Sequence, residues 1–547
     1  MSRLMAATIA AILIISSLLS AAAVDWIEVR SPVVNPQNGT PVYWGSQQLW
    51  GTEEPQSKFT GFYYDIDDDL GTESITLNIN EVGVLDGSSE PKGIIYKTEA
   101  QDKAFKFQRW GNYRCIGFLG ENYLAGYSSS EAADSYPYLY KKSTDANILD
   151  REKLLKVLID DDEESIAASG NKIPLKAGYE IEIKGVDING NTVYLQLLKN
   201  GQIVGESTIT PSDDIQNIKD STYCFTKDVV DVKGIVLIAV HFKNSFLSED
   251  REVATIDGIF QISEVPVDVA SNTEYGKMTV SNVGSDSIVL ENKDNSITLA
   301  SDIDKEIMSG LFIKTADQVA TVEDPIRFYI YKNITEPGTY EVRGVTKEAV
   351  SGADISWDAT NFPGFYYDLN NNLGGESLQL SLSADPTEDN SEPAEAVYRT
   401  AAEECEFDLE EWQKYYAIGF LGEKCFAGYV ENSADPQDNS KLYSESSDTN
   451  LMDDEILAQV LIDDDEEHQP LGVGSVIPLK EGYELHIISI DTNGNKVVVR
   501  LSKDGQDVEP ESTGSERRVR LPLQEISGKQ RGDCNHSCAF PQCLFQQ

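Results

Sequence analysis

The chain repeats itself at long range, and this duplication constrains its architecture more than any other feature of the sequence. The string GFYYD occurs at 61–65 and again at 364–368, and IGFLGE occurs at 116–121 and 418–423. LIDDDEE returns unchanged from 158–164 to 461–467, and IPLK from 173–176 to 477–480. The offset stays between 302 and 304 residues, so the sequence indicates two copies of one large unit rather than a short solenoid repeat.

The two copies differ in length, and this difference sets the expected domains. Copy one covers residues 25–340, whereas copy two covers 341–513, where the correspondence stops. The remaining residues, 514–547, carry five basic and three acidic residues and three of the seven cysteines, unlike the acidic, cysteine-poor chain before them. We therefore predict that 514–547 is an unrelated, frame-shifted tail and that copy two is truncated, lacking a counterpart of 209–340.

Strand signals dominate both copies. Residues 179–184 and 193–197 alternate between apolar and polar side chains, which is typical of half-buried strands. Asn189-Gly190 and Asn493-Gly494 lie between such runs at equivalent places, as in type I′ hairpins. One short amphipathic helix is expected per copy, at 150–158 and 455–461. The predicted class is all-β: tandem β-sandwich modules, two in a complete copy, with one or two short helices per copy.

Charge and the N-terminal residues indicate export and exclude one class of partner. The chain has 44 Lys and Arg against 92 Asp and Glu, a net charge of −48 that would repel nucleic acid. Arg3, the apolar run 6–19 and the small residues 21–23 predict a secretory signal over 1–23, the alternative being an uncleaved anchor. Beyond residue 23 no apolar stretch exceeds strand length, so no membrane anchor is expected in the chain as given.

Acidic residues at alternating positions resemble a calcium loop in each copy. Their oxygens suit a hard cation, although the glycine comes one residue later than calcium loops require. The candidate ligands are Asp65, Asp67, Asp69 and Glu73 in copy one, and Asp368, Asn370, Asn372 and Glu376 in copy two. The competing interpretation is a solvated acidic turn. Calcium or another divalent cation is thus the one cofactor that the sequence suggests.

A run of five carboxylates also occurs in each copy, where the like charges repel one another unless cations or water screen them. The runs are Asp160, Asp161, Asp162, Glu163 and Glu164, and Asp463, Asp464, Asp465, Glu466 and Glu467. The favoured interpretation is a solvated face that follows the short helix. The alternative is a role in a lattice or in ion binding.

Catalytic machinery is not indicated by the sequence. The four histidines, at 241, 468, 486 and 536, have no counterparts between the copies, and no catalytic or nucleotide-binding motif occurs. We therefore predict a protein that is not an enzyme. The sequons at Asn38 and Asn333 predict N-glycosylation of an exported chain, the alternative being chance occurrence.

The order of these motifs over residues 25–513, GFYYD-x5-G-x-E, Y-[KR]-T, IGFLGE, LIDDDEE and IPLK-x-GYE, resembles the tandem domain of Methanosarcina-type archaeal S-layer proteins. The resemblance implies β-sandwich modules and self-association into a porous, negatively charged sheet on the cell surface. It also implies a polar tether and a membrane anchor, which this sequence does not show. The alternatives are a secreted carbohydrate-binding or adhesive β-sandwich protein and, less favoured, an acidic secreted hydrolase.

Overall fold

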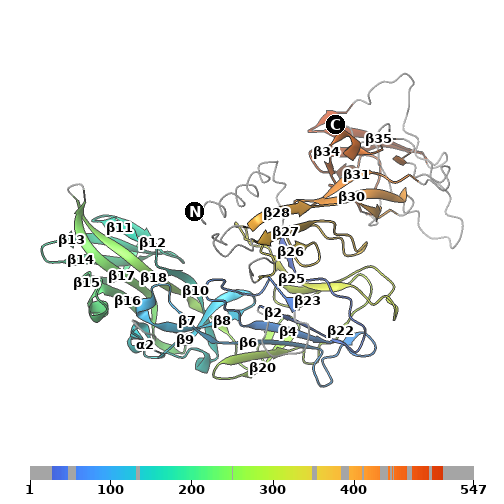
Figure 1. Ribbon diagram of the computed structural model, residues 1–547. Coiled ribbons are helices and arrows are strands. Elements are labelled where there is room, and N and C mark those ends of the chain that lie inside the picture. Colours follow the sequence, from blue (N-terminus) through green and yellow to red (C-terminus); the bar gives the residue numbers. More distant parts are fainter. Residues whose placement is uncertain are drawn as a thin grey trace. The chain divides into compact units, whose positions relative to one another are not determined.

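A computed structural model describes residues 27–46, 57–130, 136–248, 251–347, 354–382, 393–409, 412–431, 442–443, 446, 449–464, 471–491 and 496–508. The predicted signal 1–23 and tail 514–547 lie outside these residues. The chain divides into two compact units, one of Met1–Gly364 with Leu382–Pro393 and one of Phe365–Ser381 with Ala394–Gln547. Strands are the predominant regular structure in both units, which confirms the all-β class (Figure 1).

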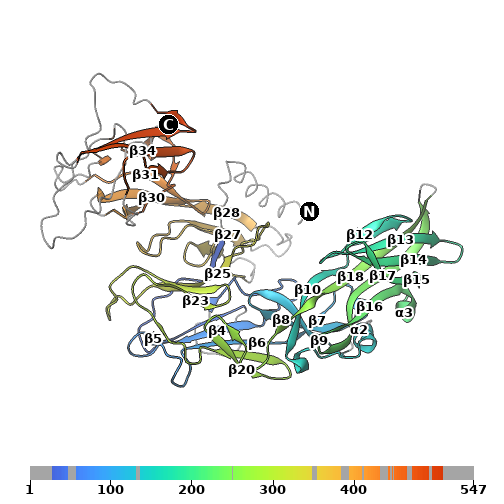
Figure 2. The same cartoon turned by 180° about the vertical axis from the view of Figure 1, so that it is seen from behind.

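Unit 1 contains two sandwich modules with separate cores. In the first, one sheet has the order β16-β17-β18-β10-β9-β8-β7, with β11 added to β18, and packs against the sheet β12-β13-β14-β15 around one core (Figures 1 and 2). The strands of the large sheet are β7 (Gln101–Ala104), β8 (Asn112–Phe118), β9 (Glu121–Tyr127), β10 (Lys153–Asp161), β11 (Ser165–Ala168), β16 (Thr222–Val229), β17 (Val232–Ser248) and β18 (Arg251–Asp268). Those of the small sheet are β12 (Lys172–Pro174), β13 (Tyr179–Asp187), β14 (Thr192–Lys199) and β15 (Gln202–Ile209).

The second module has the sheet orders β19-β20-β21-β6-β4-β2-β3 and β1-β25-β24-β23, with the small pair β22-β5. Its first sheet contains β2 (Pro41–Gly45), β3 (Ser57–Lys58), β4 (Glu73–Asn78), β6 (Ile94–Glu99), β19 (Glu274–Tyr275), β20 (Met278–Val283) and β21 (Ser287–Glu291). The others are β1 (Ile27–Arg30), β5 (Val84–Leu85), β22 (Ile297–Thr298), β23 (Asp304–Met308), β24 (Leu311–Thr315) and β25 (Phe328–Ile334). Unit 1 also includes β26 (Asp354–Asp358).

Strands β8, β9 and β10 each contribute side chains to both cores. On β8, Tyr113 and Cys115 point into the first core while Ile116 and Phe118 point into the second. On β10 the adjacent residues Leu154 and Leu155 are divided in the same way. These strands are therefore buried on both faces where the two cores meet, whereas residues such as Arg114 and 156–161 are partly exposed.

Unit 2 repeats part of this architecture. Its strands are β27 (Ser377–Leu382), β28 (Pro393–Arg399), β29 (Glu403–Glu406), β30 (Lys414–Phe420), β31 (Glu423–Tyr429), β32 (Ala458–Gln459), β33 (Val476–Pro478), β34 (Tyr483–Asp491), β35 (Lys496–Lys503) and β36 (Gln506–Asp507). The sheet β29-β30-β31-β32 corresponds to β7-β8-β9-β10, and β33-β34-β35-β36 corresponds to β12–β15. The registers agree: Phe426 pairs with Ala458 as Leu124 pairs with Leu155. The sequence duplication is therefore a structural duplication.

The helices predicted at 150–158 and 455–461 were wrong. A 3₁₀ turn, η2 (Leu149–Arg151), ends at Glu152, whose φ of 55° stops it, and β10 follows. Copy two repeats this with η6 (Leu451–Asp454) before β32. The leucines suit a helical face, but pairing of β10 with both β9 and β18 places them in two cores instead. The helices of unit 1 are α2 (Tyr138–Lys142) and α3 (Ile218–Ser221) among the residues described.

The predicted hairpin at Asn189-Gly190 forms, but not as a two-residue type I′ turn. The connection between β13 and β14 has four residues, 188–191, and the left-handed residue is Asn191, with φ of 47°. The Gly190 N–H donates to the Asp187 carboxylate over 3.0 Å, which closes the loop. The equivalent Asn493-Gly494 lies outside the described residues. Across the part of the chain that is described, no helix has the length and hydropathy needed to cross a membrane.

Candidate functional site

The motifs shared by the two copies converge on one buried carboxylate. Glu73, the first residue of β4, is 2% exposed. Its carboxylate accepts hydrogen bonds from the Tyr63 N–H at 2.7 Å, the Tyr96 hydroxyl at 2.8 Å and the Gly120 N–H at 2.9 Å. These donors belong to GFYYD, Y-[KR]-T and IGFLGE respectively, so one side chain ties three distant segments together.

Copy two builds the same arrangement around Glu376. Its carboxylate accepts from the Tyr366 N–H at 2.7 Å, the Tyr398 hydroxyl at 2.7 Å and the Gly422 N–H at 3.1 Å. Each donor is the counterpart of a donor in copy one. The repeated motifs therefore encode one repeated hydrogen-bond network.

Burial raises the pKa of Glu73, the glutamate of copy one. Removal from water raises the pKa of Glu73 to about 6, although the hydrogen bonds from Tyr63, Gly120 and Tyr96 act in the opposite direction. A buried carboxylate costs free energy unless donors surround it, and here three donors do so. The geometry suits a fixed structural acceptor.

A second buried cluster lies where the GFYYD loop meets the large sheet. Lys103 on β7, whose side chain is 4% exposed, forms ion pairs with Asp65 and, at 3.4 Å, with Asp68. Burial disfavours the ammonium, but Asp65 outweighs this and holds the pKa of Lys103 above its ordinary value. Although burial acts to raise the pKa of Asp65, Lys103 outweighs it and the net direction is downward. The pair is therefore charged at neutral pH.

Asp160, near the end of β10, completes this cluster. Its carboxylate accepts from the Lys106 N–H at 3.0 Å and the Tyr113 hydroxyl at 3.3 Å. Burial raises the pKa of Asp160 to about 6 against the effect of these donors and of Lys103. The first residue of the acidic run is thus an interior group.

Copy two keeps the aspartates of this cluster but supplies the ammonium from another strand. Lys424 on β31 lies 3.3 Å from Asp463 and 4.0 Å from Asp368. Copy one has Asn122 at the position of Lys424, and copy two has Cys405 at the position of Lys103. The Tyr415 hydroxyl donates to Asp463 over 2.8 Å, as Tyr113 donates to Asp160.

The proposed calcium ligands are not gathered into one set. Glu73 and Glu376 face the networks above, Asp65 pairs with Lys103, and Asp67 pairs with Lys106 at 2.6 Å. Asp69 and Asn372 accept from Tyr64 and Tyr367, and Asn370 lies in the same turn as Asn372. Within the described residues, no group of three or more His, Cys, Asp or Glu side chains is arranged to hold a metal ion. Calcium binding stays a prediction.

A left-handed residue closes the loop in both copies. Asp69 and Asn372 have φ of 47° and 54°, a region that Asp and Asn tolerate better than most side chains. Backbone hydrogen bonds join Asp65 to Leu70 and Asp368 to Leu373 in both directions. The alternation of Asp and Asn is therefore explained in part by loop geometry.

The interpretation of the acidic runs as a solvated face after a helix was wrong at their first residues. A strand precedes the run in copy one, and Asp160 and Asp463 each bind tyrosine hydroxyls inside their own unit. Asp161 is half-buried, whereas Asp162, Glu163, Glu164 and Asp464 are exposed, as expected of a solvated face. Glu164 forms an ion pair with Lys243. Asp465, Glu466 and Glu467 lie outside the described residues.

Comparison with known proteins supplies the family. The model of a family described as S-layer protein matches residues 46–317 and 346–517, one match in each copy. The chain belongs to the S-layer protein family. It is 31% identical over 546 residues to the Major S-layer protein of Methanosarcina mazei, an alignment that covers 96% of this chain and 72% of that protein. The Major S-layer protein of Methanosarcina barkeri is also 31% identical, over 93% of this chain and 69% of the relative.

The two predicted glycan acceptors of this S-layer family chain lie in different settings. Asn38 is exposed in a turn, where an acceptor is accessible. Asn333 lies within β25 and is half-buried, and its Oδ1 is buried without a hydrogen-bond partner in the described part of the chain. Glycosylation at both positions stays a prediction.

Sequence reasoning missed the lysines of this S-layer family chain. Lys103 and Lys424 do not align, so neither belongs to a motif shared by the copies. The detectable signal was the exchange itself: relative to copy one, copy two has Cys405 in place of a lysine on β29 and gains Lys424 on β31. Tyr96 and Tyr398 were visible in Y-[KR]-T, but their contact with the glutamates was not.

Proposed function

We propose that this chain is a structural surface-layer protein that associates with itself into an acidic, porous sheet on the cell exterior. Membership of the S-layer family, with a match in each tandem copy, is the observation that carries this proposal. Relatives named Major S-layer protein align along more than nine-tenths of the chain and support it. The secretory signal predicted at 1–23 agrees with an exported product.

The role is structural rather than catalytic. Glu73 is buried and Asp65 and Asp160 are half-buried; the pKa of each of these carboxylates is shifted, and each is bound to donors of its own copy. A general acid or base needs a proton exchanged with a substrate, whereas these groups hold segments of the fold together. The buried polar groups described above thus serve the scaffold.

The net charge implies that a sheet of this protein would select among the solutes that pass through its openings. With 92 acidic against 44 basic residues, openings between copies would be lined by negative potential, which favours cations and neutral solutes over anions. The Debye length of roughly 8 Å at physiological salt limits this field to narrow openings. Anion exclusion should therefore weaken as salt is added.

Assembly is tested by electron microscopy of the purified chain across a salt series. Sheets or ordered patches should increase from roughly 10 mM to roughly 150 mM salt, because screening reduces repulsion between copies. Dye permeation through such sheets should favour a cationic dye over an anionic dye of equal size. A chain that stays monomeric under every condition would refute the lattice.

A further inference from the structure

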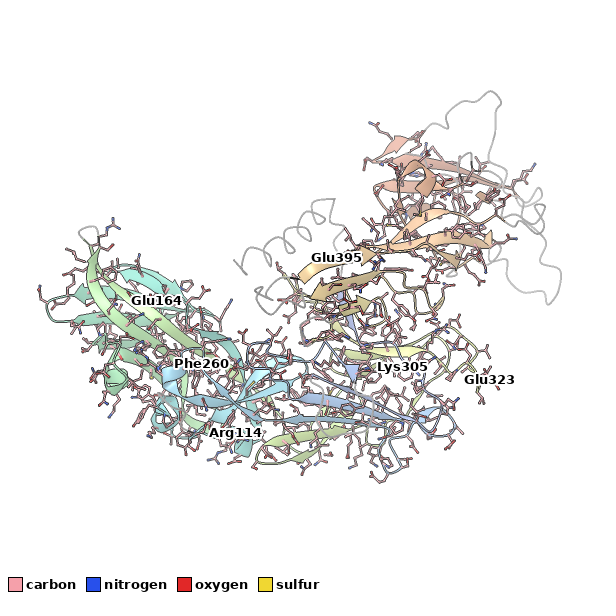
Figure 3. All side chains as sticks on the ribbon, viewed as in Figure 1. Arg114, Glu164, Phe260, Lys305, Glu323 and Glu395 are labelled. Atoms are coloured by element: carbon pink, nitrogen blue, oxygen red, sulfur yellow. The ribbon has the colours of Figure 1, made fainter. Side chains whose placement is uncertain are left out.

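Copy one shows how the edge of β10 is covered. Strand β10 lies between β9 and β18, and the register pairs Val157 with Ile262 and Ile159 with Gln261. Phe260 of β18, labelled in Figure 3, is opposite Asp160 and fully buried. The second half of β18 therefore supplies both a backbone partner and apolar side chains to this edge.

The equivalent edge of copy two is open in the residues that the structure describes. Strand β32 pairs with β31 in the register of β10 with β9, but no described strand pairs with its other side. It has two residues where β10 has nine. An edge strand with unpaired backbone groups is a template for another strand.

One side chain that shares a core with β17 and β18 in copy one is exposed in copy two. Val186 is 5% exposed, whereas its counterpart Ile490 is 37% exposed. In copy one, part of the cover comes from β17 and β18, whose side chains share a core with Val186.

The family matches indicate which segment would cover the edge. The match in copy two spans 172 residues, whereas the match in copy one spans 272. Subtracting the offset of about 303 residues places the end of the second match near position 214 of copy one, just before β16. The part of the family domain that follows this position is the part that contains β18.

We propose that the open edge formed by β32 and residues 460–464 accepts a β-strand of the β18 pattern from another polypeptide. Binding would occur by strand addition, in which the main chain supplies most of the affinity and alternate side chains supply the specificity. The side chain opposite Asp463 must be smaller than Phe260, because copy two has the larger Phe426 where copy one has Leu124. The ring of Phe426 lies 5.8 Å from that of Tyr415. This proposal does not depend on lattice formation.

The test uses the full chain and a fluorescein-labelled peptide of residues 256–268 carrying Phe260→Val. We expect saturable binding by fluorescence anisotropy, with slower hydrogen exchange at 456–464. A matched peptide that also carries Gln261→Pro cannot continue a strand ladder and should bind at least about tenfold more weakly. Equal binding of the two peptides would overturn the proposal.

The location of binding is tested with Ile462→Pro in the full chain. Ile462 follows β32, and its counterpart Ile159 pairs with β18, so proline should block the incoming strand without breaking the pairing of β32 with β31. The matched variant Ile462→Val should bind like the parent, and near-identical melting curves would show that both variants fold. No saturable binding by the parent, or exchange protection confined to unit 1, would refute the proposal.

Discussion

Lys103 and Lys424 place an ammonium group beside the equivalent aspartates Asp65 and Asp368 from two different strands, β7 in copy one and β31 in copy two. The position vacated in each copy holds a smaller uncharged residue, Asn122 or Cys405. Each cluster thus contains one such lysine, but the strand that carries it differs between the copies.

Lys103→Met should destabilise unit 1 by about 3–5 kcal/mol, because it leaves a buried aspartate without its partner. Lys106→Met is the matched control, since Lys106 pairs with Asp67 nearer the surface and should cost under about 1 kcal/mol. The free energy of unfolding is measured by denaturant titration. An equal loss of unfolding free energy in the two variants would show that the buried pair stabilises the fold no more than the exposed pair does.

The double variant Lys103→Cys with Asn122→Lys transfers the copy-two arrangement to copy one. We expect it to recover at least half of the stability lost in Lys103→Met, because the ammonium again reaches the aspartates, now from β9 instead of β7. The same titration measures the recovery. Asn122→Lys alone, which crowds two ammonium groups together, should be less stable than the double variant.

Unit 1 should lose stability as the pH rises from about 4.5 to about 6.5. Burial raises the pKa of Glu73 to about 6, so its contribution is complete below the ordinary pKa of 4.5 and is lost as pH passes the raised value. Asp160 acts in the same direction. The contribution of Glu73 is about 2 kcal/mol. Melting temperatures across this range measure the change.

Glu73→Gln isolates that contribution. The amide cannot ionise, so the pH dependence should flatten by about the amount assigned to Glu73. Overall stability should also fall, because the amide nitrogen faces the Tyr63 or Gly120 N–H in place of an acceptor. A profile for Glu73→Gln that parallels the parent would contradict the assignment.

Calcium binding by the GFYYD loop is tested with Asp67→Asn and Asp69→Asn together. These changes leave the Asp65–Lys103 pair intact, so a changed calcium response reflects the loop and not the buried cluster. We expect calcium to raise the melting temperature of the parent, and the rise to shrink in the variant. Calorimetric titration without binding heat in the parent would return the loop to its alternative interpretation, a solvated turn.

Copy one should fold by itself, but better as residues 25–364 than as 25–340. The Arg30 guanidinium donates to the carbonyls of Ala359 and Phe362, and Arg343 donates to the Phe62 carbonyl over 2.9 Å. The shorter segment loses all of these bonds. Thermal melts of both segments measure the difference, and a shorter segment that is as stable as the longer one would show that residues 341–364 are dispensable.

The sequence was sufficient for the duplication, the strand-rich class and the family, because long identical strings and period-two runs are local signals. It was not sufficient for Leu154 and Leu155, whose spacing suits a helix until pairing with β18, about 100 residues later, decides for a strand. Nor could it place Asp160, since the groups that surround it lie about 50 residues earlier. Glu73 was named as a candidate ligand because it follows the acidic loop, whereas its contacts with Tyr96 and Gly120 could not be predicted because these donors come from separate segments.

Strands β8 to β10, which contribute side chains to both cores, have a mechanical consequence for a protein of this family. Each module of unit 1 uses these strands as one wall of its core, so neither can be pulled open without exposing apolar surface of the other. Under tension the two modules should rupture as a single event rather than in sequence. A coat built from such units would resist stretching up to one threshold force and then yield by a whole unit at a time.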